Sequence, residues 1–404
     1  MNNIILYDSA AVHADMLPLS FTRPVSDFRV GITTISEKWQ SCLPGKYSVY
    51  TAPYLRDKFR PMPQADNLFV AANTLPSAEL SDAILSLAVG QAITLPDGEY
   101  IAFRGSMDRF EQLIAGAYEP EKITFNGDCT PLHHLYDIFL NNGKAIVSDY
   151  RRITAGRKSQ PLPEGNLLIG SPVMEDGTPA IFIEEGAKIA GATLNVTDGP
   201  IYIGKDATIQ EGSCVRGPLA LCERARINMG AKIYPDTTLG PYVKVGGELN
   251  NVVIFGYSNK AHDGYLGNAV IGEWCNIGAG TNASNLKNDY TKIRLWNYPK
   301  RSFLRTDLQF CGLFMGDHSK AGINCMFNTA TVVGVGCNLH GAGYQRPFVP
   351  SFSEGSPQAG FKDVNLVKFF DIAERAMGRR GIELTDLDRR IFKAIFDVAS
   401  TYKR

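Results

Sequence analysis

One feature of this sequence restricts its fold more than any other: aliphatic residues recur at every sixth position over a long stretch. An α-helix with 3.6 residues per turn would scatter positions six apart over all of its faces. A strand of period two gives no reason for an aliphatic residue at every sixth position in particular. Eight consecutive positions follow the rule: Ile203, Ile209, Val215, Leu221, Ile227, Ile233, Leu239 and Val245.

A coil with three short flat sides of about six residues explains this spacing. Each side points one aliphatic side chain inward, and successive coils stack about 4.8 Å apart. Ile183 and Ile189 begin the spacing, and Ile323, Thr329 and Val335 resume it. We therefore predict a hexapeptide-repeat parallel β-helix over residues 166–350. Small residues suit its tight corners: Ala207, Gly212, Ala225 and Ala231.

The repeat is interrupted at residues 255–267 and again at 282–308. Interruptions in a solenoid usually place loops on one side, and that side is often the binding side. The first interruption carries a single histidine, His262, among glycines and small residues. We expect the active site of this region to lie there.

Length, charge and cysteine content limit the class of protein. A chain of 404 residues is expected to form two or three domains. Its 41 basic and 41 acidic side chains cancel, so no overall field favours nucleic acid or a membrane surface. There is no secretory signal and no apolar window of membrane-spanning length, so we expect a cytoplasmic protein. The eight cysteines form no CxxC motif and no zinc spacing with histidine, which indicates small buried residues in a reducing compartment.

The first 149 residues alternate short apolar runs with polar helical segments, which predicts an α/β domain with a mainly parallel sheet. Proteins of this build bind ligands at the carboxyl ends of their strands, where the loop 17–39 is expected to lie. Residues 131–142 are expected to form a helix that leaves the domain. Residues 150–165 are polar and proline-containing, and we interpret them as a linker.

The glycine-rich pattern ends after Ser351, and the segment 351–404 is predicted to be helical. Apolar stripes indicate helices over 363–378 and 385–401. Thr385 and Asp388 have the spacing of a capping box for the second helix. These helices are expected to cap the solenoid or to contact another subunit.

The interrupted region also carries a specific motif. The stretch KAHDGYLGNAVIGEWCNIGAGT, followed by Asn285, resembles the acetyltransferase half of the bifunctional GlmU family. The pairing of LPLSFTRP and RVGITTISEKW with GGELNN and GYSNKAHDG resembles the variant, Bacteroidetes-type branch of that family. The resemblance implies a sugar nucleotidyltransferase-like domain followed by a left-handed β-helix, in a homotrimer. It also implies acetyl transfer from acetyl-CoA to glucosamine 1-phosphate and uridylyl transfer from UTP, giving UDP-N-acetylglucosamine.

Roles follow from the resemblance residue by residue. His262 falls on the catalytic base, and Glu248 on the carboxylate that orients it. Tyr265, Asn276 and Asn285 fall on substrate contacts, and Ala279 with Gly280 on the acetyl-CoA wall. The basic residues that hold the sugar phosphate have no clean match, because asparagines (Asn228, Asn250 or Asn251) fall near those positions. Candidate replacements are Lys260, Lys287, Lys244 and Arg226.

The chemistry fits these residue types. Acylation of an amine by a thioester needs a base for the amine proton, and histidine titrates near neutral pH. Glu248 would fix the tautomer, while GAGT amides or Asn285 would stabilise the oxyanion. The alternatives are that His262 is a loop histidine without a task, and that the asparagines fill β-helix corners because they tolerate left-handed backbone.

The nucleotide site is less defined. Arg23, Arg29 and Lys38 are expected to face the triphosphate, although the family's GxGTR glycines are missing. Asp128 in the GDCTPL segment is the candidate Mg²⁺ ligand, and the other position carries Asn73, a poor charge match for Mg²⁺. Either the metal site lies elsewhere, or this half is weak or inactive. Two alternatives to a bifunctional enzyme therefore stay open: an acetyltransferase with a vestigial nucleotide-binding domain, and a non-catalytic β-helix scaffold for oligomerisation.

Overall fold

The computed structural model describes residues 1–403, which divide into two compact units. The N-terminal unit comprises Met1–Phe28 and Thr33–His134. The C-terminal unit comprises Arg29–Ile32 and the chain from Leu135 onward. The division thus falls earlier than the predicted domain end at residue 149.

The N-terminal unit is an α/β domain, as predicted. Its six-stranded sheet has the order β2-β1-β3-β6-β5-β7. Strand β1 pairs in parallel with β2 and β3, and β5 pairs in parallel with β7, whereas β6 runs antiparallel to both of its neighbours. The strands are β1 (Asn2–Tyr7), β2 (Gly45–Tyr50), β3 (Asn67–Ala71), β5 (Gln91–Thr94), β6 (Tyr100–Gly105) and β7 (Glu121–Thr124), with a small pair β4 (Thr74–Leu75) and β8 (Thr130–Pro131). The helices are α1 (Ala10–Asp15), α2 (Ile35–Cys42), α3 (Ala78–Ser86) and α4 (Met107–Ile114).

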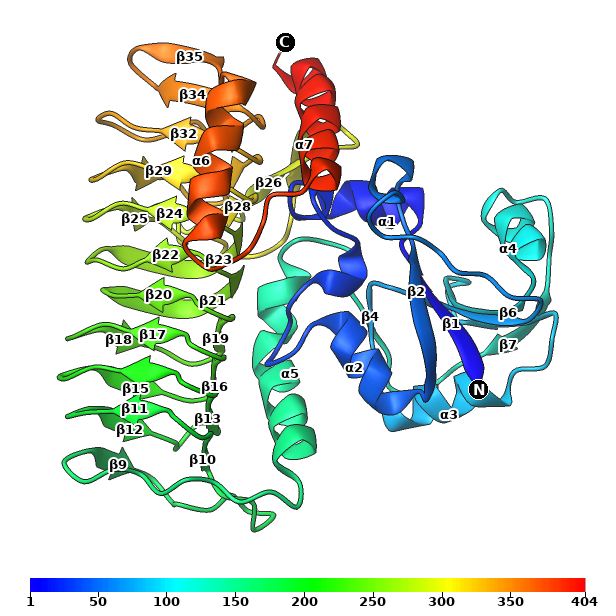
Figure 1. Ribbon diagram of the computed structural model, residues 1–404, viewed down its shortest axis with the longest axis horizontal. Coiled ribbons are helices and arrows are strands. Elements are labelled where there is room, and N and C mark those ends of the chain that lie inside the picture. Colours follow the sequence, from blue (N-terminus) through cyan, green and yellow to red (C-terminus); the bar gives the residue numbers. More distant parts are fainter. Residues whose placement is uncertain (404) are drawn as a thin grey trace. The chain divides into compact units, whose positions relative to one another are not determined.

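The C-terminal unit is a parallel β-helix whose coils stack from β9 to β34, as Figure 1 shows. Each coil has three flat sides, which we call A, B and C. Side A contains β9 (Leu167–Ile169), β12 (Thr193–Asn195), β15 (Cys214–Arg216), β18 (Lys232–Ile233), β25 (Asn282–Ala283) and β30 (Met326–Phe327). Side B contains β10 (Ile181–Ile183), β13 (Ile201–Ile203), β16 (Leu219–Leu221), β19 (Thr237–Leu239), β28 (Phe314–Met315), β31 (Val332–Val333) and β33 (Phe348–Val349). Side C contains β11 (Lys188–Ile189), β14 (Thr208–Ile209), β17 (Arg226–Ile227), β20 (Lys244–Val245), β22 (Asn259–Lys260), β24 (Asn276–Ile277), β29 (Lys320–Ala321), β32 (Asn338–Leu339) and β34 (Ser353–Ser356).

Two longer strands, β21 (Glu248–Gly256) and β23 (Tyr265–Glu273), continue from side A into side B. The last strand, β35 (Gly360–Asp363), folds back antiparallel on β34 and closes the stack.

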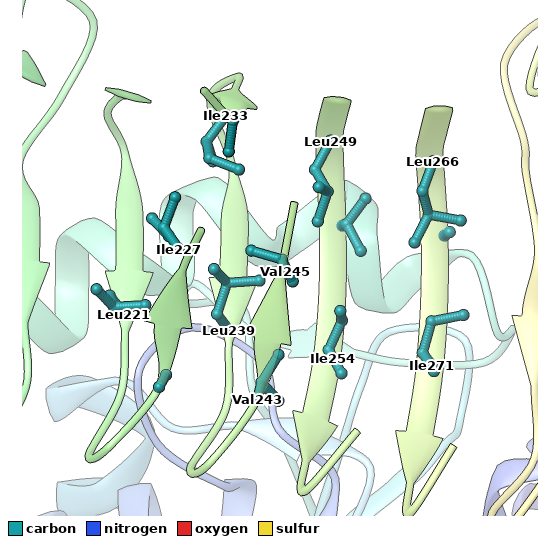
Figure 2. Close-up of a cluster of buried hydrophobic side chains, with 14 of the residues drawn as sticks. Leu221, Ile227, Ile233, Leu239, Val243, Val245, Leu249, Ile254, Leu266 and Ile271 are labelled. Carbon is teal, nitrogen blue, oxygen red and sulfur yellow. The ribbon is translucent and has the colours of Figure 1, made fainter. Parts of the chain in front are cut away.

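The inward column of aliphatic side chains is confirmed. All eight residues of the predicted six-residue repeat are at most 2% exposed and belong to one core cluster. Figure 2 shows Leu221, Ile227, Ile233 and Leu239 pointing into the space between the coil walls. Because each side chain contacts the equivalent residue of the next coil, the column holds the coils in register.

The repeat resumes in a different phase from the predicted one. Ile323 is 71% exposed, and the inward positions after the second interruption are Ala321, Phe327, Val333 and Leu339. The phase changes because the interruptions and shortened corners are not multiples of six residues; Val245 is followed inward by Leu249, only four positions later.

Aromatic side chains stack along the corner between sides B and C. Tyr242, Tyr257, Trp274 and His318 all have left-handed backbone, with φ between 54° and 62°. Their rings stack from coil to coil, and the Tyr257 and Trp274 centroids lie 4.3 Å apart at an interplanar angle of 9°. Left-handed backbone is unfavourable for side chains of this kind. The stacking offsets part of that cost.

Three helices cover the outside of the β-helix. Helix α5 (Asp137–Thr154) packs on side B, where Ile146 and Tyr150 join a cluster with Phe182 and Ala220. Residues 150–154, predicted to begin a linker, therefore end this helix, because Tyr150 and Thr154 are buried. Helices α6 (Leu366–Gly378) and α7 (Asp386–Ala399) confirm the two C-terminal helices, and Thr385 with Asp388 forms the expected capping box.

Phe369 of α6 and Phe392 of α7 make T-shaped contacts with the His318 ring, with centroids 5.7 and 5.2 Å apart. The two terminal helices therefore cap the aromatic corner of the β-helix.

The cysteines are all free, and five of the eight are buried. Within residues 1–403, none of the helices combines the length and the apolar character needed to cross a membrane.

Replacing Ile227 by alanine tests the inward column. The Ile227 side chain is completely buried, so Ile227→Ala is expected to lower the free energy of unfolding by about 2–5 kcal/mol. Ile169→Ala, at a position 40% exposed in the same β-helix, should cost much less. Urea denaturation of both variants measures the difference, and equal losses would contradict the inward assignment.

Candidate active site

His262 lies in a turn, residues 261–264, at the corner between β22 on side C and β23 on side A. The side chain is exposed, and among residues 1–403 no other group forms a hydrogen bond or ion pair with its imidazole. The main chain around it is held firmly. All four carbonyl groups of the turn accept hydrogen bonds: Ala261 O from Asn228 Nδ2 (2.8 Å), His262 O from Lys260 Nζ, Asp263 O from Gly280 N (3.0 Å) and Gly264 O from Glu248 N (3.1 Å).

Glycines allow this close packing. A Cβ atom on Gly264, where φ is 123°, would lie 2.0 Å from Thr281 O in the next coil. A Cβ on Gly246 would lie 2.5 Å from Ala261 O in the turn itself. The turn therefore requires glycine at position 264, and the preceding coil requires it at position 246. His262 is presented on a main chain that is closely packed between coils.

Lys260 stands directly beneath this turn. It occupies an inward position in register with Val245 and is 2% exposed. Its ammonium donates to Gly246 O at 3.0 Å and to His262 O. Burial lowers the pKa of Lys260 to about 8. The buried ammonium holds the main chain of the turn, and the contact of Lys260 with substrate stays a prediction.

A second group of polar side chains lies on side A. Tyr265 OH accepts a hydrogen bond from Asn285 Nδ2 at 3.0 Å, and Asn285 Nδ2 also donates to Asn268 Oδ1 at 2.7 Å. Burial raises the pKa of Tyr265, and hydrogen bonds from Asn250 and Asn285 oppose that shift. The structure thus brings together the predicted Tyr265 and Asn285.

Gly267 makes room for this group. A Cβ atom there would lie 2.3 Å from Tyr265 OH and 2.7 Å from Asn285 Nδ2. The Tyr265 phenol and the Asn285 amide consequently occupy the space that a side chain at position 267 of β23 would fill.

Glu248 does not meet His262 within the protomer. It pairs in register with Tyr265, three residues beyond the histidine, and its carboxylate lies 3.9 Å from Lys232 Nζ. No hydrogen bond joins Glu248 to the imidazole among the described residues, since one lies on a flat side and the other on a corner. The orienting role of Glu248 stays a prediction.

Lys232 is a candidate that the sequence analysis missed. Lys232, Glu248 and Tyr265 each precede an inward aliphatic residue, and the strand pairing aligns all three in one outward column. The sequence signal was available: Lys232 directly precedes the inward Ile233, just as Tyr265 directly precedes the inward Leu266, so both are expected in one outward column.

The remaining predicted acetyltransferase residues lie in different places. Ala279 and Gly280 form the corner of the next coil, directly after the His262 turn, as the Gly280 hydrogen bond to Asp263 shows. Asn276 is exposed on side C, away from Tyr265 and Asn285. Lys287 begins a long insertion between β25 and β28, where its ammonium donates to Thr291 Oγ1 and Lys292 O.

The three cations predicted for the nucleotide do not gather within one unit. Arg23 and Lys38 are 8% and 5% exposed in the N-terminal unit, and Lys38 Nζ donates to Thr33 Oγ1 at 3.2 Å. Arg29 belongs to the C-terminal unit, where its guanidinium donates to the main-chain carbonyls of Phe255 and Ile32.

The candidate metal positions do not form a preformed metal site. Asp128 is exposed, and Asn73 donates its amide to Leu132 O at 3.0 Å. No cluster of three or more histidine, cysteine, aspartate or glutamate side chains suited to a metal ion occurs in residues 1–403. The residues present do not fit a protein-held Mg²⁺ ion by themselves.

The carboxyl ends of β1 and β2 carry a polar network that the sequence analysis missed. His13 Nδ1 lies 2.9 Å from Asp8 Oδ2, and Thr51 Oγ1 donates to the same oxygen at 2.8 Å. His13 Nε2 lies 3.0 Å from Tyr54 OH, which itself donates to Phe21 O. Asp8 Oδ1 is buried without a partner. The sequence feature that could have indicated this network is Asp8, which directly follows the buried strand β1. The carboxyl ends of strands are where α/β sheets bind ligands.

Comparisons with known proteins bear on both units. Residues 4–158 match the family model described as sugar nucleotidyl transferase. A bifunctional sugar-1-phosphate nucleotidylyltransferase/acetyltransferase of Sulfurisphaera tokodaii is 29% identical over 35% of this chain and 35% of its own length. The bifunctional protein GlmU of Nostoc is 33% identical over 55% of this chain and 45% of its own length. GlmU of Stenotrophomonas maltophilia is 36% identical over 30% of this chain and 27% of its own length.

The matches cover less than half the length of each of these relatives. The match to the solved structure of Francisella novicida UDP-N-acetylglucosamine acyltransferase covers 55% of this chain and 77% of that chain, at 14% identity and a TM-score of 0.29. The fold and the matches define the class: a sugar nucleotidyl transferase domain joined to a hexapeptide-repeat β-helix. Within the matched stretches, the sequence is similar to bifunctional GlmU proteins.

The lowered pKa of Lys260 predicts a pH dependence of stability. Between about pH 8 and the ordinary lysine pKa of 10.5, the unfolded chain binds one more proton at this side chain than the folded protein. Stability attributable to Lys260 therefore rises with pH across this range. Relative to Lys260→Met, wild-type protein should gain about 1–2 kcal/mol between pH 7.5 and 9.5, measured by urea denaturation.

Lys232→Met is the matched control, because the Lys232 side chain is 64% exposed. Its stability should follow the wild-type pH course. If Lys260→Met also follows that course, the buried ammonium is wrongly placed.

Proposed function

We propose that this protein is a cytoplasmic sugar-nucleotide biosynthesis enzyme with two transferase activities. One transfers an acetyl group from acetyl-CoA to the amine of glucosamine 1-phosphate. The other transfers a uridylyl group from UTP to the sugar 1-phosphate, giving UDP-N-acetylglucosamine. The observation that carries the proposal is His262, an exposed imidazole on a corner whose four carbonyl groups all accept hydrogen bonds and which leads directly into Tyr265 at the start of β23.

The acetyl transfer follows from this geometry. His262 takes the proton from the attacking amine while the new C–N bond forms at the thioester carbonyl. The C–S bond then breaks, and the imidazolium returns its proton to the departing thiolate. Ala279 and Gly280, in the next coil of the same corner, leave room for the thioester arm. Lys232, Tyr265 and Asn285 hold the sugar phosphate on side A.

Support for the nucleotidyl transfer comes from the family match over residues 4–158 and from the names of the relatives. Asp8, His13 and Asn73 all belong to that matched region. Arg23 and Lys38 remain the candidate phosphate contacts. Any Mg²⁺ would be held largely by the phosphates and water, with Asp128 as the candidate carboxylate, since the chain offers no preformed cluster.

An assay on purified protein tests the proposal. Glucosamine 1-phosphate, acetyl-CoA, UTP and Mg²⁺ are supplied, and free thiol and pyrophosphate are followed separately. Both products are expected. Thiol without pyrophosphate would reduce the proposal to an acetyltransferase with a vestigial nucleotide-binding domain, and neither product would leave the oligomerisation scaffold.

Replacing the base tests the assignment of His262. His262→Ala should lower acetyl transfer by about 10²–10⁴-fold and leave pyrophosphate release from N-acetylglucosamine 1-phosphate and UTP unchanged. His340→Ala is the matched control, because His340 is exposed and lies at the same corner in a later coil. Activity of His262→Ala within a few-fold of wild type would show that another group is the base.

We also propose that the active form is a homotrimer in which a second copy covers the His262 corner. The support is apolar exposure along that corner: Met229 is 67% exposed and Ile323 is 71% exposed. A neighbouring copy would bury both side chains and could supply the orienting contact that Glu248 does not make within one protomer.

A charge at this corner should break the trimer. Ile323→Lys is expected to give a smaller species in light scattering coupled to gel filtration, because a lysine would be buried without a partner. Val367→Lys, at a position 72% exposed on α6, is the control and should keep the wild-type mass. A monomeric wild-type protein, or an unchanged mass for Ile323→Lys, would contradict the proposal.

A further inference from the structure

The long insertion between β25 and β28 forms a structured arm, residues 286–310. Leu286 and Phe310 pair antiparallel at its base, and its outer part is the hairpin β26 (Arg294–Asn297) and β27 (Ser302–Arg305). Trp296 of the hairpin stacks on Phe348 of side B, with centroids 4.1 Å apart at 12°. The arm therefore packs against a coil that follows it in the chain.

A pocket of about 560 Å³ lies between the arm and the β-helix. Its volume is in the range of pockets that bind small organic ligands. Side A supplies Ser284, Asn328 and Thr329, and two aromatic rings are available, Phe303 and the 60% exposed Tyr344. Ser284 directly follows β25, which pairs with β23, so the pocket adjoins the Tyr265 and Asn285 group on the same side.

The charge of the arm favours an anion. Residues 286–310 carry six basic and two acidic side chains, in a chain whose charges balance as a whole. The hydrogen bonds of the two cations in the pocket go to neutral acceptors: Arg294 donates to Phe303 O, and Lys287 donates to Thr291 Oγ1 and Lys292 O. The one acidic residue in the lining, Asp289, accepts hydrogen bonds from the Thr291 amide and hydroxyl, and these bonds together with the nearby Lys287 charge lower its pKa. Both cations keep donors for a ligand.

We infer that this pocket binds a nucleoside phosphate. The phosphate lies between Lys287 and Arg294, and the base lies against Tyr344 and Phe303, with Asn328 available for its polar edge. A phosphate group matches the two cations, and a planar base matches the exposed ring. The inference rests on the proposed function only for the choice of nucleotides to test. These are the nucleotide part of the acyl donor, CoA, and the nucleotide part of the product, UDP.

Isothermal titration calorimetry without turnover tests the pocket separately from the two activities. Adenosine 3′,5′-bisphosphate and CoA represent the acyl donor, UDP represents the nucleotide sugar, and inorganic phosphate is the reference. At least one nucleotide should bind more tightly than phosphate. Binding by the first pair alone assigns the pocket to the donor, and binding by UDP alone assigns it to the nucleotide sugar.

Variants locate the bound molecule. Arg294→Ala and Lys287→Ala should each weaken binding about tenfold or more, and Tyr344→Ala should reduce the preference over phosphate. Arg305→Ala is the matched control, because Arg305 pairs with Arg294 across the hairpin but does not line the pocket. Its affinity should stay within twofold of wild type.

Three results would overturn the inference. The first is that no nucleotide binds more tightly than phosphate. The second is that Arg305→Ala weakens binding as much as Arg294→Ala, which would indicate general attraction by the basic arm. The third is that Tyr344→Ala leaves the preference for nucleotides unchanged. Binding with no acetyl or uridylyl transfer would support the pocket while rejecting the proposed function.

Discussion

The stacking of equivalent residues from coil to coil is the interaction on which the rest of the C-terminal unit depends. Inward aliphatic side chains meet their counterparts above and below, so each coil is buried by its neighbours rather than by a separate layer. Parallel pairing then carries every outward position into a column. The columns, rather than the order along the chain, decide which polar side chains become neighbours: Lys232, Glu248 and Tyr265 come from three successive coils.

The corners use the same principle in two opposite ways. At the corner between sides B and C, large aromatic residues take left-handed backbone and stack, and the terminal helices cover them. At the corner between sides C and A, glycines let the coils approach closely, and the main-chain carbonyls around His262 accept hydrogen bonds from Lys260 and from other coils. One corner is therefore a ladder of stacked rings, and the other presents the candidate base on a main chain held by hydrogen bonds.

Lys260 links the core to the site. An inward lysine in an aliphatic column is unfavourable unless its ammonium finds acceptors. Two main-chain carbonyls supply them, and one belongs to His262. The arm of residues 286–310 leaves the coil next to the Tyr265 group, and its Trp296 stacks on Phe348. It encloses a basic pocket that adjoins side A.

Much of the fold could be predicted from the residues because a six-residue period is a local property of the chain. The spacing from Ile203 to Val245 determined the β-helix, the Thr385 and Asp388 spacing determined a helix start, and the interrupted repeat located His262 as the candidate base. Local pattern could not tell that Ile323 is exposed or that residues 150–154 are helical. Both depend on what packs against them: the phase of the coil after an insertion, and the burial of Tyr150 on side B.

The candidate site can likewise be separated into features that the sequence predicted and features that only packing decided. The sequence by itself determined which residue types were available, including a histidine, carboxylates, amides and lysines near one interruption. Only the tertiary structure decided that Lys260 points into the core, that Glu248 pairs with Lys232, and that Arg29 belongs with the β-helix rather than with Arg23 and Lys38. The physical reason is that register between coils sets these contacts, and register is a relation between distant segments that no local spacing encodes.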